Sequence, residues 1–190
     1  MAIFEDNFKD NRNNWWEGKT EYGEAEIDNS LYIESFKAEG FYLTRVLQID
    51  DKYSFEIEID SHYSTDGGGE HGIIWSHIRN DNNESEFYYV FLIRVQYRGK
   101  SMFCIRNFNK GVFTDIQPWK ECSYIIHVPN KLKIYKLDND IDNSISFMIN
   151  NHQVIKTTYL PICGEGVGIV VNGIRDVYVN YFKARYTEKR

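Results

Sequence analysis

The sequence predicts an all-β protein, folded as a two-sheet antiparallel β-sandwich. Aromatic residues make up 16% of the chain, with 14 Tyr and 12 Phe, and aromatic and β-branched residues favour strands. Short segments of alternating apolar and polar side chains recur about every 10 residues, a spacing typical of sandwiches and barrels. No segment has the apolar periodicity of a three-turn amphipathic helix. We expect about twelve to fourteen strands, by analogy with other sandwiches.

The clearest strand is Tyr53–Asp60, which alternates without a break. Because side chains of a strand point to opposite faces in turn, one set is apolar and the other acidic. The apolar set, predicted to lie in the core, is Phe55, Ile57 and Ile59. The acidic set, predicted to face water or a ligand, is Glu56, Glu58 and Asp60.

Phe87–Tyr97 is apolar at nearly every position, which is typical of a central strand covered on both faces. If Tyr89, Phe91 and Ile93 face the core, the alternation puts a second set on the opposite face: Tyr88, Val90, Leu92 and Arg94. By the same rule Ser101–Phe108 turns Phe103 and Ile105 inward and Cys104 and Arg106 outward. The segments Tyr88–Arg94 and Ser101–Phe108 therefore share an outer surface.

Other parts of the chain have weaker signals. Lys110–Glu121 has the composition of a loop, and Cys122–His127 that of a strand. Asn150-Asn151 predicts a tight hairpin, because Asn tolerates a positive φ. The segment His62–Glu70, with three consecutive glycines, predicts a loop.

Size and charge limit the possible functions. The 190 residues predict one domain spanning 1–190. The net charge is −6 and there is no basic block, so neither nucleic acid nor an anionic membrane is an expected partner. Three widely spaced cysteines argue against disulfides or a zinc site. No secretory signal or membrane span is recognisable, so we expect a cytoplasmic protein, or an extracytoplasmic one if these residues are trimmed from a longer chain.

The opening FEDNFKDNRNNWWEG resembles the D-x-F-x-D-N…W start of bacterial domains with the concanavalin A-like lectin/glucanase jelly roll, including the laminin-G-like and 3-keto-disaccharide hydrolase-like (DUF1080) groups. Further segments resemble those domains in the same order: Asp28–Tyr32, Phe55–Asp60, Gly72–Trp75, Tyr88–Ile93, Asn130–Ile134, Phe147–Val154, Gly166–Val171 and Val177–Phe182. Asn151, Val179 and Asn180 depart from the pattern at turn and core positions. The resemblance implies two curved sheets whose concave face binds glycans in many relatives.

Glu56, Glu58 and Asp60 are the candidate catalytic groups. Glycoside hydrolysis uses two carboxylates about 5–5.5 Å apart for retention or about 6.5–9.5 Å for inversion, and alternate residues of a strand are about 6.5–7 Å apart. However, the order E-x-E-x-D differs from the E-x-D-x-(x)-E of the family-16 glucanases that share the fold. A solvated outer face is therefore the favoured interpretation, and no catalytic residue is assigned.

Aromatic and arginine side chains are the candidate ligand contacts. An aromatic ring suits the C–H face of a pyranose, and a guanidinium suits its hydroxyls. The alternative is that these large aromatics only fill the core. The candidates are Trp75, Tyr88, Arg94, Arg106 and Trp119.

Asp138, Asp140 and Asp142 imitate half of a calcium loop. Ile149 occupies the position where an EF-hand needs its bidentate glutamate, so a polar hairpin tip is favoured. A looser calcium site at Asp66 and Glu70 is a second alternative. We expect no cofactor, with calcium as the one ion the sequence leaves open.

The leading functional prediction is a non-catalytic recognition module that binds a carbohydrate on the concave sheet face. One alternative is a glycoside hydrolase or other sugar-processing enzyme that uses the strand carboxylates. The other is a protein-interaction or structural sandwich without a small-molecule ligand. The expected partner is accordingly a glycan or a protein.

Overall fold

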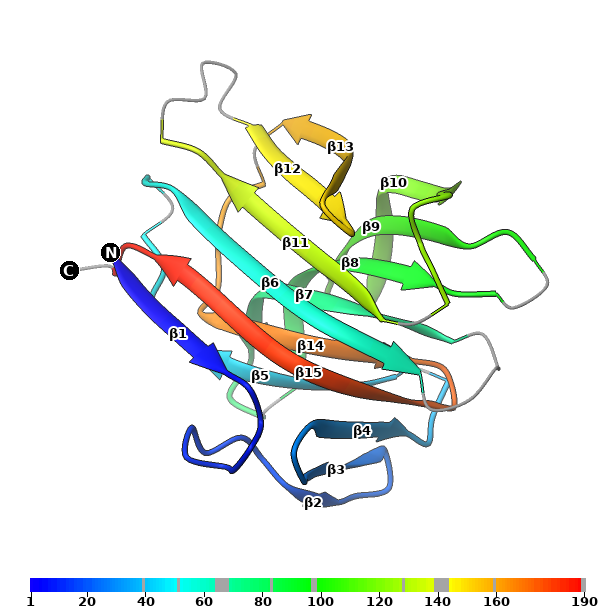
Figure 1. The fold of residues 1–190 in the computed structure, drawn as a ribbon. Helices are drawn as coiled ribbons and strands as arrows, with labels where there is room; N and C mark the ends of the chain where they lie inside the picture. The colour runs from blue at the N-terminus through cyan, green and yellow to red at the C-terminus, as the bar shows by residue number, and fades with distance from the viewer. Residues whose placement is uncertain are drawn as a thin grey trace.

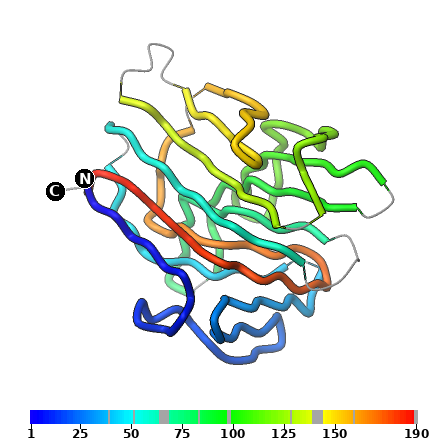
Figure 2. The backbone as a smooth tube through the Cα atoms, in the orientation of Figure 1, coloured from blue at the N-terminus to red at the C-terminus, as the bar shows by residue number. Residues whose placement is uncertain are grey.

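The computed structural model describes residues 1–38, 40–50, 52–63, 69–82, 84–96, 99–127, 129–138, 144–158 and 160–188. These residues contain fifteen strands in two antiparallel sheets, with the larger sheet in front of the smaller one in Figures 1 and 2. The prediction of an all-β sandwich is thus confirmed. Within the described ranges, no helix is long and apolar enough to cross a membrane.

The larger sheet has nine strands in the order β13-β12-β11-β6-β15-β4-β3-β2, and β1 pairs with β15 beyond the residues that pair with β4. Its strands are Ala2–Asp6 (β1), Gly18–Lys19 (β2), Gly23–Ile27 (β3), Leu31–Ser35 (β4), Phe55–Tyr63 (β6), Asn130–Lys136 (β11), Ser144–Ile149 (β12), His152–Thr158 (β13) and Arg175–Tyr186 (β15).

The smaller sheet has six strands in the order β10-β9-β8-β7-β14-β5. They are Phe41–Val46 (β5), Glu70–Arg79 (β7), Ser85–Arg94 (β8), Met102–Asn109 (β9), Val112–Glu121 (β10) and Gly166–Asn172 (β14). Strands β5 and β10 are the two edges of this sheet.

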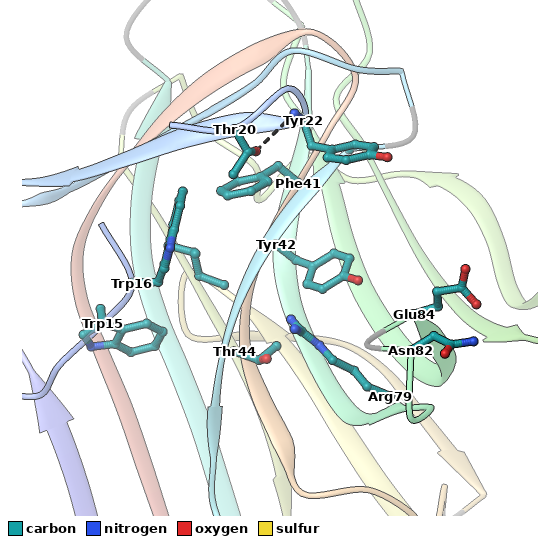
Figure 3. A pocket seen from close by; sticks show the side chains of 12 residues that line it. Trp15, Trp16, Thr20, Tyr22, Phe41, Tyr42, Thr44, Arg79, Asn82 and Glu84 are labelled. Carbon is teal, nitrogen blue, oxygen red and sulfur yellow. Dashed lines mark hydrogen bonds between the residues drawn. The ribbon is translucent and has the colours of Figure 1, made fainter. Parts of the chain in front are cut away.

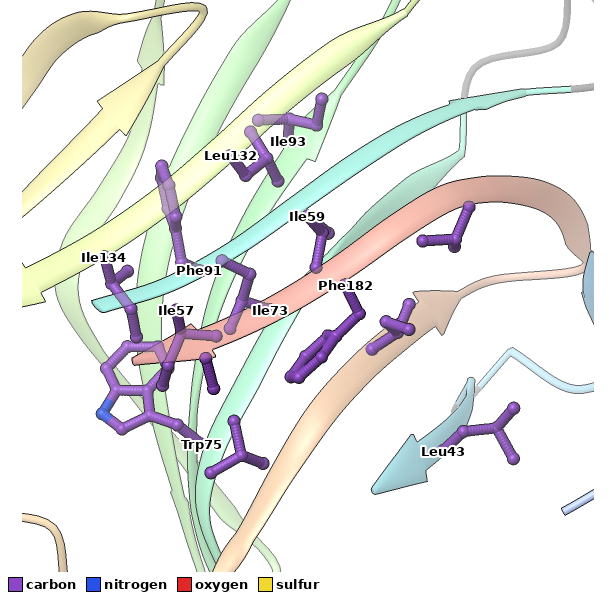
Figure 4. Packing of buried hydrophobic residues seen from close by; sticks show 14 of the residues in the cluster. Leu43, Ile57, Ile59, Ile73, Trp75, Phe91, Ile93, Leu132, Ile134 and Phe182 are labelled. Carbon is purple, nitrogen blue, oxygen red and sulfur yellow. The ribbon is translucent and has the colours of Figure 1, made fainter. Parts of the chain in front are cut away.

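One apolar cluster fills the space between the sheets. Strand β6 contributes its predicted apolar set, Phe55, Ile57 and Ile59, all at most 2% exposed. Figure 4 shows Ile57 and Ile59 opposite side chains of β7 and β8. Each fully buried side chain of this kind stabilises the fold by about 1.5–3 kcal/mol. Burial of these residues therefore fixes which face of β6 is inward and leaves its carboxylates outside.

The smaller sheet is also apolar on its outer face. The inner set of β8 and β9 belongs to the main core and consists of Tyr89, Phe91, Ile93, Phe103 and Ile105. A second cluster lies on the opposite side and consists of Ile74, Tyr88, Val90, Leu92, Cys104 and Val170. The predicted inward and outward sets are confirmed for the described residues of β8 and β9, and so is the burial of both faces of β8.

Two local predictions are wrong. Lys110–Glu121 is not a loop, because residues from Val112 onward form the edge strand β10, with two register shifts that break the alternation. Such bulges, and a Pro such as Pro118, are tolerated at a sheet edge. Cys122–His127 is not a strand, because the Asn130 side chain bonds both the N–H and the C=O of Ile126 (3.0 and 2.8 Å) and holds a turn. Strands β1, β2 and β10 were not expected, which raises the count above the predicted fourteen.

Candidate functional site

A polar row crosses three neighbouring strands on the outer face of the six-stranded sheet. The register places Asn172 of β14 opposite Glu70 of β7, and Glu70 opposite Arg94 of β8. Asn172 Nδ2 donates to Glu70 Oε2 at 3.5 Å, and Arg94 Nη2 forms an ion pair with Glu70 Oε1. The sheet itself therefore positions these three side chains.

Trp119 extends this row toward β9 and β10. The Arg94 guanidinium lies 4.4 Å from the centroid of the Trp119 ring, and that of Arg106 lies 5.9 Å from it. Arg106 Nε also donates to Asp115 Oδ1 at 2.6 Å, across the β9–β10 pair. Guanidinium groups are attracted to indole rings at such distances. Trp119 thus holds both arginines in place, and its ring beneath Arg94 does not offer that face to a sugar.

A hollow of about 940 Å³ lies over this part of the sheet. We call it the arginine groove. Its polar and aromatic lining residues are Glu70, Arg94, Gln96, Arg106, Phe113, Asn172 and Arg175. Its volume falls in the usual range of ligand sites, about 300–1,000 Å³. Phe113 is 49% exposed and supplies an apolar ring. The groove combines guanidinium donors, two amides, one carboxylate and an aromatic ring, which are the groups that bind saccharides and other polar ligands.

Two of the five predicted ligand contacts, Arg94 and Arg106, line the groove. Trp75 does not, because it is 0% exposed and lies in the main core. Its ring stacks on Tyr89 at 5.3 Å, the residue opposite it in the register. The prediction that Trp75 contacts a ligand is therefore wrong, and the residue is a core residue.

Tyr88 faces outward as predicted but is covered by neighbouring rings. It stacks on Phe108 at 4.7 Å and makes edge contacts with Phe113 and His77. Burial raises the pKa of the Tyr88 hydroxyl. Tyr88 therefore packs beneath Phe108 and Phe113 and does not line the groove.

The three carboxylates of β6 lie on the outer face of the other sheet. Glu58 forms ion pairs with Lys133 Nζ at 2.7 Å and with Lys131 Nζ at 3.7 Å. It also accepts a hydrogen bond from the Tyr181 hydroxyl. Burial alone would raise the pKa of Glu58, but the bonds from Lys133 and Tyr181 outweigh it and hold the pKa below its ordinary value. A general acid needs the opposite shift.

The neighbours of Glu58 are engaged in the same way. Glu56 pairs with Lys133 at 3.2 Å, and Asp60 accepts a hydrogen bond from Asn180 Nδ2 at 2.6 Å. These contacts are those of an ion-pair network on a sheet surface, which argues against the catalytic alternative.

A second hollow, of about 730 Å³, lies over the edge of β5. We call it the edge pocket. Figure 3 shows Trp16 and Phe41 on one side of β5 and Tyr42 on the other. The Arg79 guanidinium lies 5.6 Å from the centroid of the Tyr42 ring. The edge pocket does not include any of the five predicted ligand contacts.

A histidine lies beside the edge pocket. His77 Nε2 is 3.0 Å from Ser85 Oγ, and Ser85 also bonds the Tyr42 hydroxyl. Burial, with the Arg79 charge acting in the same direction, lowers the pKa of His77 to about 4. Its other ring nitrogen faces the Thr44 hydroxyl at 3.4 Å and not a carboxylate. We therefore regard this group as a packing network and not as a nucleophile–base pair.

The structure holds no metal candidate among the residues that it describes, since no group of three or more His, Cys, Asp or Glu side chains is suitably placed. Asp138 bonds the Ser54 hydroxyl at 3.2 Å, and Glu70 is paired with Arg94. The remaining predicted calcium ligands, Asp66, Asp140 and Asp142, lie outside the described residues.

Sequence reasoning did not identify Phe113, Asn172 or Arg175 as site residues. Phe113 belongs to a segment that was expected to be a loop, and Arg175 follows the turn between β14 and β15. Asn172 ends a clear alternating segment, Gly164–Gly173, so its side of the sheet could have been deduced. That Asn172 contacts Glu70 could not be deduced, because the contact depends on the register between two strands about 100 residues apart in sequence.

No protein-family model matches the sequence, and no curated protein matches it. Among solved structures, a Bacillus subtilis protein of unknown function with a galectin-like fold is 14% identical, with a TM-score of 0.64, and the match covers 100% of this chain and 98% of that one. A legume lectin-like domain from Entamoeba histolytica is 16% identical, with a TM-score of 0.60, covering 87% of this chain and 88% of the other.

Xylan β-1,4-xylosidase from Bacillus halodurans C-125 is 11% identical, with a TM-score of 0.65, over 95% of this chain. The chain spans 38% of the length of that enzyme. At such identities the likeness shows the fold alone.

Proposed function

We propose that this protein is a non-catalytic carbohydrate-recognition module and that the arginine groove is its binding site. The observation that carries the proposal is the convergence of Arg94, Arg106 and Phe113 on one hollow of the outer sheet face. Guanidinium groups fixed by ion pairs and by Trp119 can donate to sugar oxygens without first being ordered, which lowers the entropic cost of binding. The exposed Phe113 ring provides an apolar surface for the C–H face of a sugar.

The structural neighbours support a carbohydrate-related role, since one is described as lectin-like and another as a xylosidase. Fold alone does not determine function, so the proposal is based mainly on the residues of the groove. The hydrolase alternative has less support, because Glu58 carries a lowered pKa within an ion-pair network. The interaction alternative predicts a flat or loop-covered face, whereas this face is hollowed. The narrower resemblance to the laminin-G-like and DUF1080 groups stays a prediction.

The test is a screen of immobilised plant, bacterial and host glycans, followed by titration calorimetry with any glycan that binds. We expect Phe113→Ala to weaken binding about tenfold, the loss of about 1.4 kcal/mol, because it removes the only aromatic ring that lines the groove among the described residues. Tyr22→Ala is the matched control, because Tyr22 is similarly exposed, at 53%, but lines the edge pocket.

Two results would contradict the proposal. One is the absence of binding to every glycan in the screen. The other is loss of binding in Tyr22→Ala with full binding in Phe113→Ala, which would move the site to the edge pocket. Recovery of the bound glycan uncleaved after prolonged incubation is expected of a recognition module, and release of shorter products would favour the hydrolase alternative.

A further inference from the structure

The arginine groove has the opposite charge to the rest of the molecule. The chain as a whole carries a net charge of −6. Among the described residues, the charged lining of the groove consists of three arginines, Arg94, Arg106 and Arg175, and one glutamate, Glu70. Clefts lined by one sign of charge attract ligands of the opposite sign. The positive lining of this groove on an acidic protein therefore favours an anionic ligand.

The arginines keep donors available after their contacts within the protein. A guanidinium has five N–H donors. Arg94 contacts Glu70 through Nη2, and Arg106 contacts Asp115 through Nε. Among the described residues, the other nitrogens of both groups have no hydrogen-bond partner, so they are available to a ligand in the groove, where both side chains are partly exposed.

The positions of the charges favour a ligand with repeated charge. Arg94 ends β8, Arg106 lies in the middle of β9, and Arg175 begins β15. Arg175 lies against Gly69, immediately before Glu70. The positive groups thus come from three strands, two of them over the Trp119 ring and the third beside Gly69. An extended chain with a negative group on successive units matches this distribution better than a single small anion.

We infer that the ligand of the arginine groove is an anionic oligosaccharide, whose sugar units carry carboxylate or sulfate groups. The inference rests on the proposed function and names the class of saccharide. Arginine binds planar carboxylates through two parallel N–H···O bonds, which add both affinity and orientation. Neutral hydroxyls would use the same donors but would gain nothing from the excess positive charge of the lining, in which Arg94, Arg106 and Arg175 outnumber Glu70.

The experiment compares three probes of equal length by titration calorimetry: an oligogalacturonate, a heparin-derived oligosaccharide and a neutral xylo-oligosaccharide. We expect the anionic probes to bind at least about tenfold more tightly than the neutral one. The heparin-derived probe carries carboxylates as well as sulfates, so tighter binding of that probe would show a contribution from sulfate, and tighter or equal binding of the oligogalacturonate would show that carboxylates suffice. Binding is expected to weaken as salt rises from about 0.01 M to about 0.15 M, because the screening length falls from about 30 Å to about 8 Å.

Variants test whether the named arginines are responsible. Arg94→Gln and Arg106→Gln are each expected to weaken binding of the better anionic probe about tenfold or more. Arg106→Lys keeps the charge but loses the fork geometry, so an intermediate loss is expected. Lys120→Gln is the matched control, because it removes one positive charge from an exposed position of β10 outside the groove. Thermal unfolding of each variant verifies that the fold is intact.

Failure of the inference can be told from failure of the proposed function. If the neutral probe binds as tightly as the anionic ones and Phe113→Ala weakens it, the groove binds saccharides and the anionic class is wrong. If anionic probes bind but the loss in Arg94→Gln only equals that in Lys120→Gln, binding is diffuse and the assignment of the arginines is wrong. If none of the three probes binds and no glycan of the wider screen does, the proposed function fails as well.

Discussion

Two buried tryptophans differ by one hydrogen bond. Trp15 is 3% exposed and Trp75 is 0% exposed. Trp15 Nε1 donates to Asp6 Oδ2 at 2.8 Å, whereas Trp75 Nε1 is buried with no hydrogen-bond partner among the described residues. The two rings therefore fill similar roles in packing, but only Trp15 helps to solvate a buried carboxylate.

This difference predicts unequal effects of the same substitution. Trp15→Phe and Trp75→Phe remove the same atoms, but Trp15→Phe also deprives Asp6 of a donor. We expect Trp15→Phe to lower the free energy of unfolding by about 1–2 kcal/mol more than Trp75→Phe does. Urea denaturation of both variants measures the difference. Equal losses would mean that the Trp15–Asp6 bond contributes nothing net.

Glu58 predicts a pH dependence of stability. Its pKa in the folded protein is below its ordinary value of 4.5. The unfolded chain therefore binds its proton at a higher pH than the folded protein does. Stability from Glu58 is complete above about 4.5 and is lost as the pH falls through the lower folded pKa.

We expect Glu58→Gln to cost about 2 kcal/mol near pH 7, a typical value for hydrogen bonds to a charged group, and to cost progressively less as the pH falls below 4.5. Denaturation at a series of pH values measures this. Glu121→Gln is the control, because the exposed pair of Glu121 with Lys100 is worth at most about 1 kcal/mol. A cost of Glu58→Gln that stays constant down to pH 3 would contradict the assignment.

At the scale of the element, the β12–β13 hairpin depends on two asparagines of unequal importance. Asn150 and Asn151 both have positive φ, 49° and 66°, which confirms the tight turn predicted from the sequence. The Asn150 side chain accepts from Lys131 N–H at 2.8 Å and donates to Tyr124 O at 2.7 Å. It also donates to Asn130 Oδ1 at 2.9 Å. Asn150 thus ties the hairpin to β11 and to the loop before it.

Glycine tests the two positions separately, because it adopts positive φ without strain. We expect Asn151→Gly to leave stability unchanged or raise it by a few tenths of a kcal/mol, since Asn151 is exposed. Asn150→Gly is expected to lower it by about 1–3 kcal/mol, because the side-chain bonds disappear. Thermal unfolding of both variants gives the comparison, and equal shifts of the melting temperature would show that only backbone conformation matters.

Strands were predictable where alternation was continuous. In Tyr53–Asp60 the pattern decides the face of each residue, because reversing it would expose side chains such as Ile57. Phe87–Tyr97 has no such pattern, and its apolar composition predicted only that both faces of the strand are covered. In β10 the pattern fails, since register shifts between Asp115 and Lys120 change which residues share a face. Because β10 lies at the edge of the sheet, its side chains do not need to be apolar on both faces.

At the scale of the whole molecule, the two sheets present different outer faces. The larger sheet carries an ion-pair network around Glu58 and Lys133, whereas the smaller sheet carries the arginine groove, in which three arginines outnumber one glutamate. Arg94 and Arg106 could be placed on one face from the alternation of their own strands. Arg175 could not, because its position depends on how β15, which belongs to the larger sheet, starts beside β7 and β14 of the smaller one.

The pairing of β1 with β15 has a consequence for the connectivity of the chain. Ala2 lies opposite Tyr186, and Figure 1 shows the start of β1 beside the end of β15. A flexible linker of about five Gly and Ser residues, with a mean span of about 12 Å, is expected to join them without distorting either strand.

New ends can then be opened at the turn between β9 and β10, where a side chain added at Gly111 would meet nothing within 4 Å. We expect this circular permutant to fold with the circular dichroism spectrum of the parent. An unfolded permutant would show that folding depends on the order of the strands along the chain. The same geometry lets the sandwich be inserted into a surface loop of a host protein, entering and leaving at a single point.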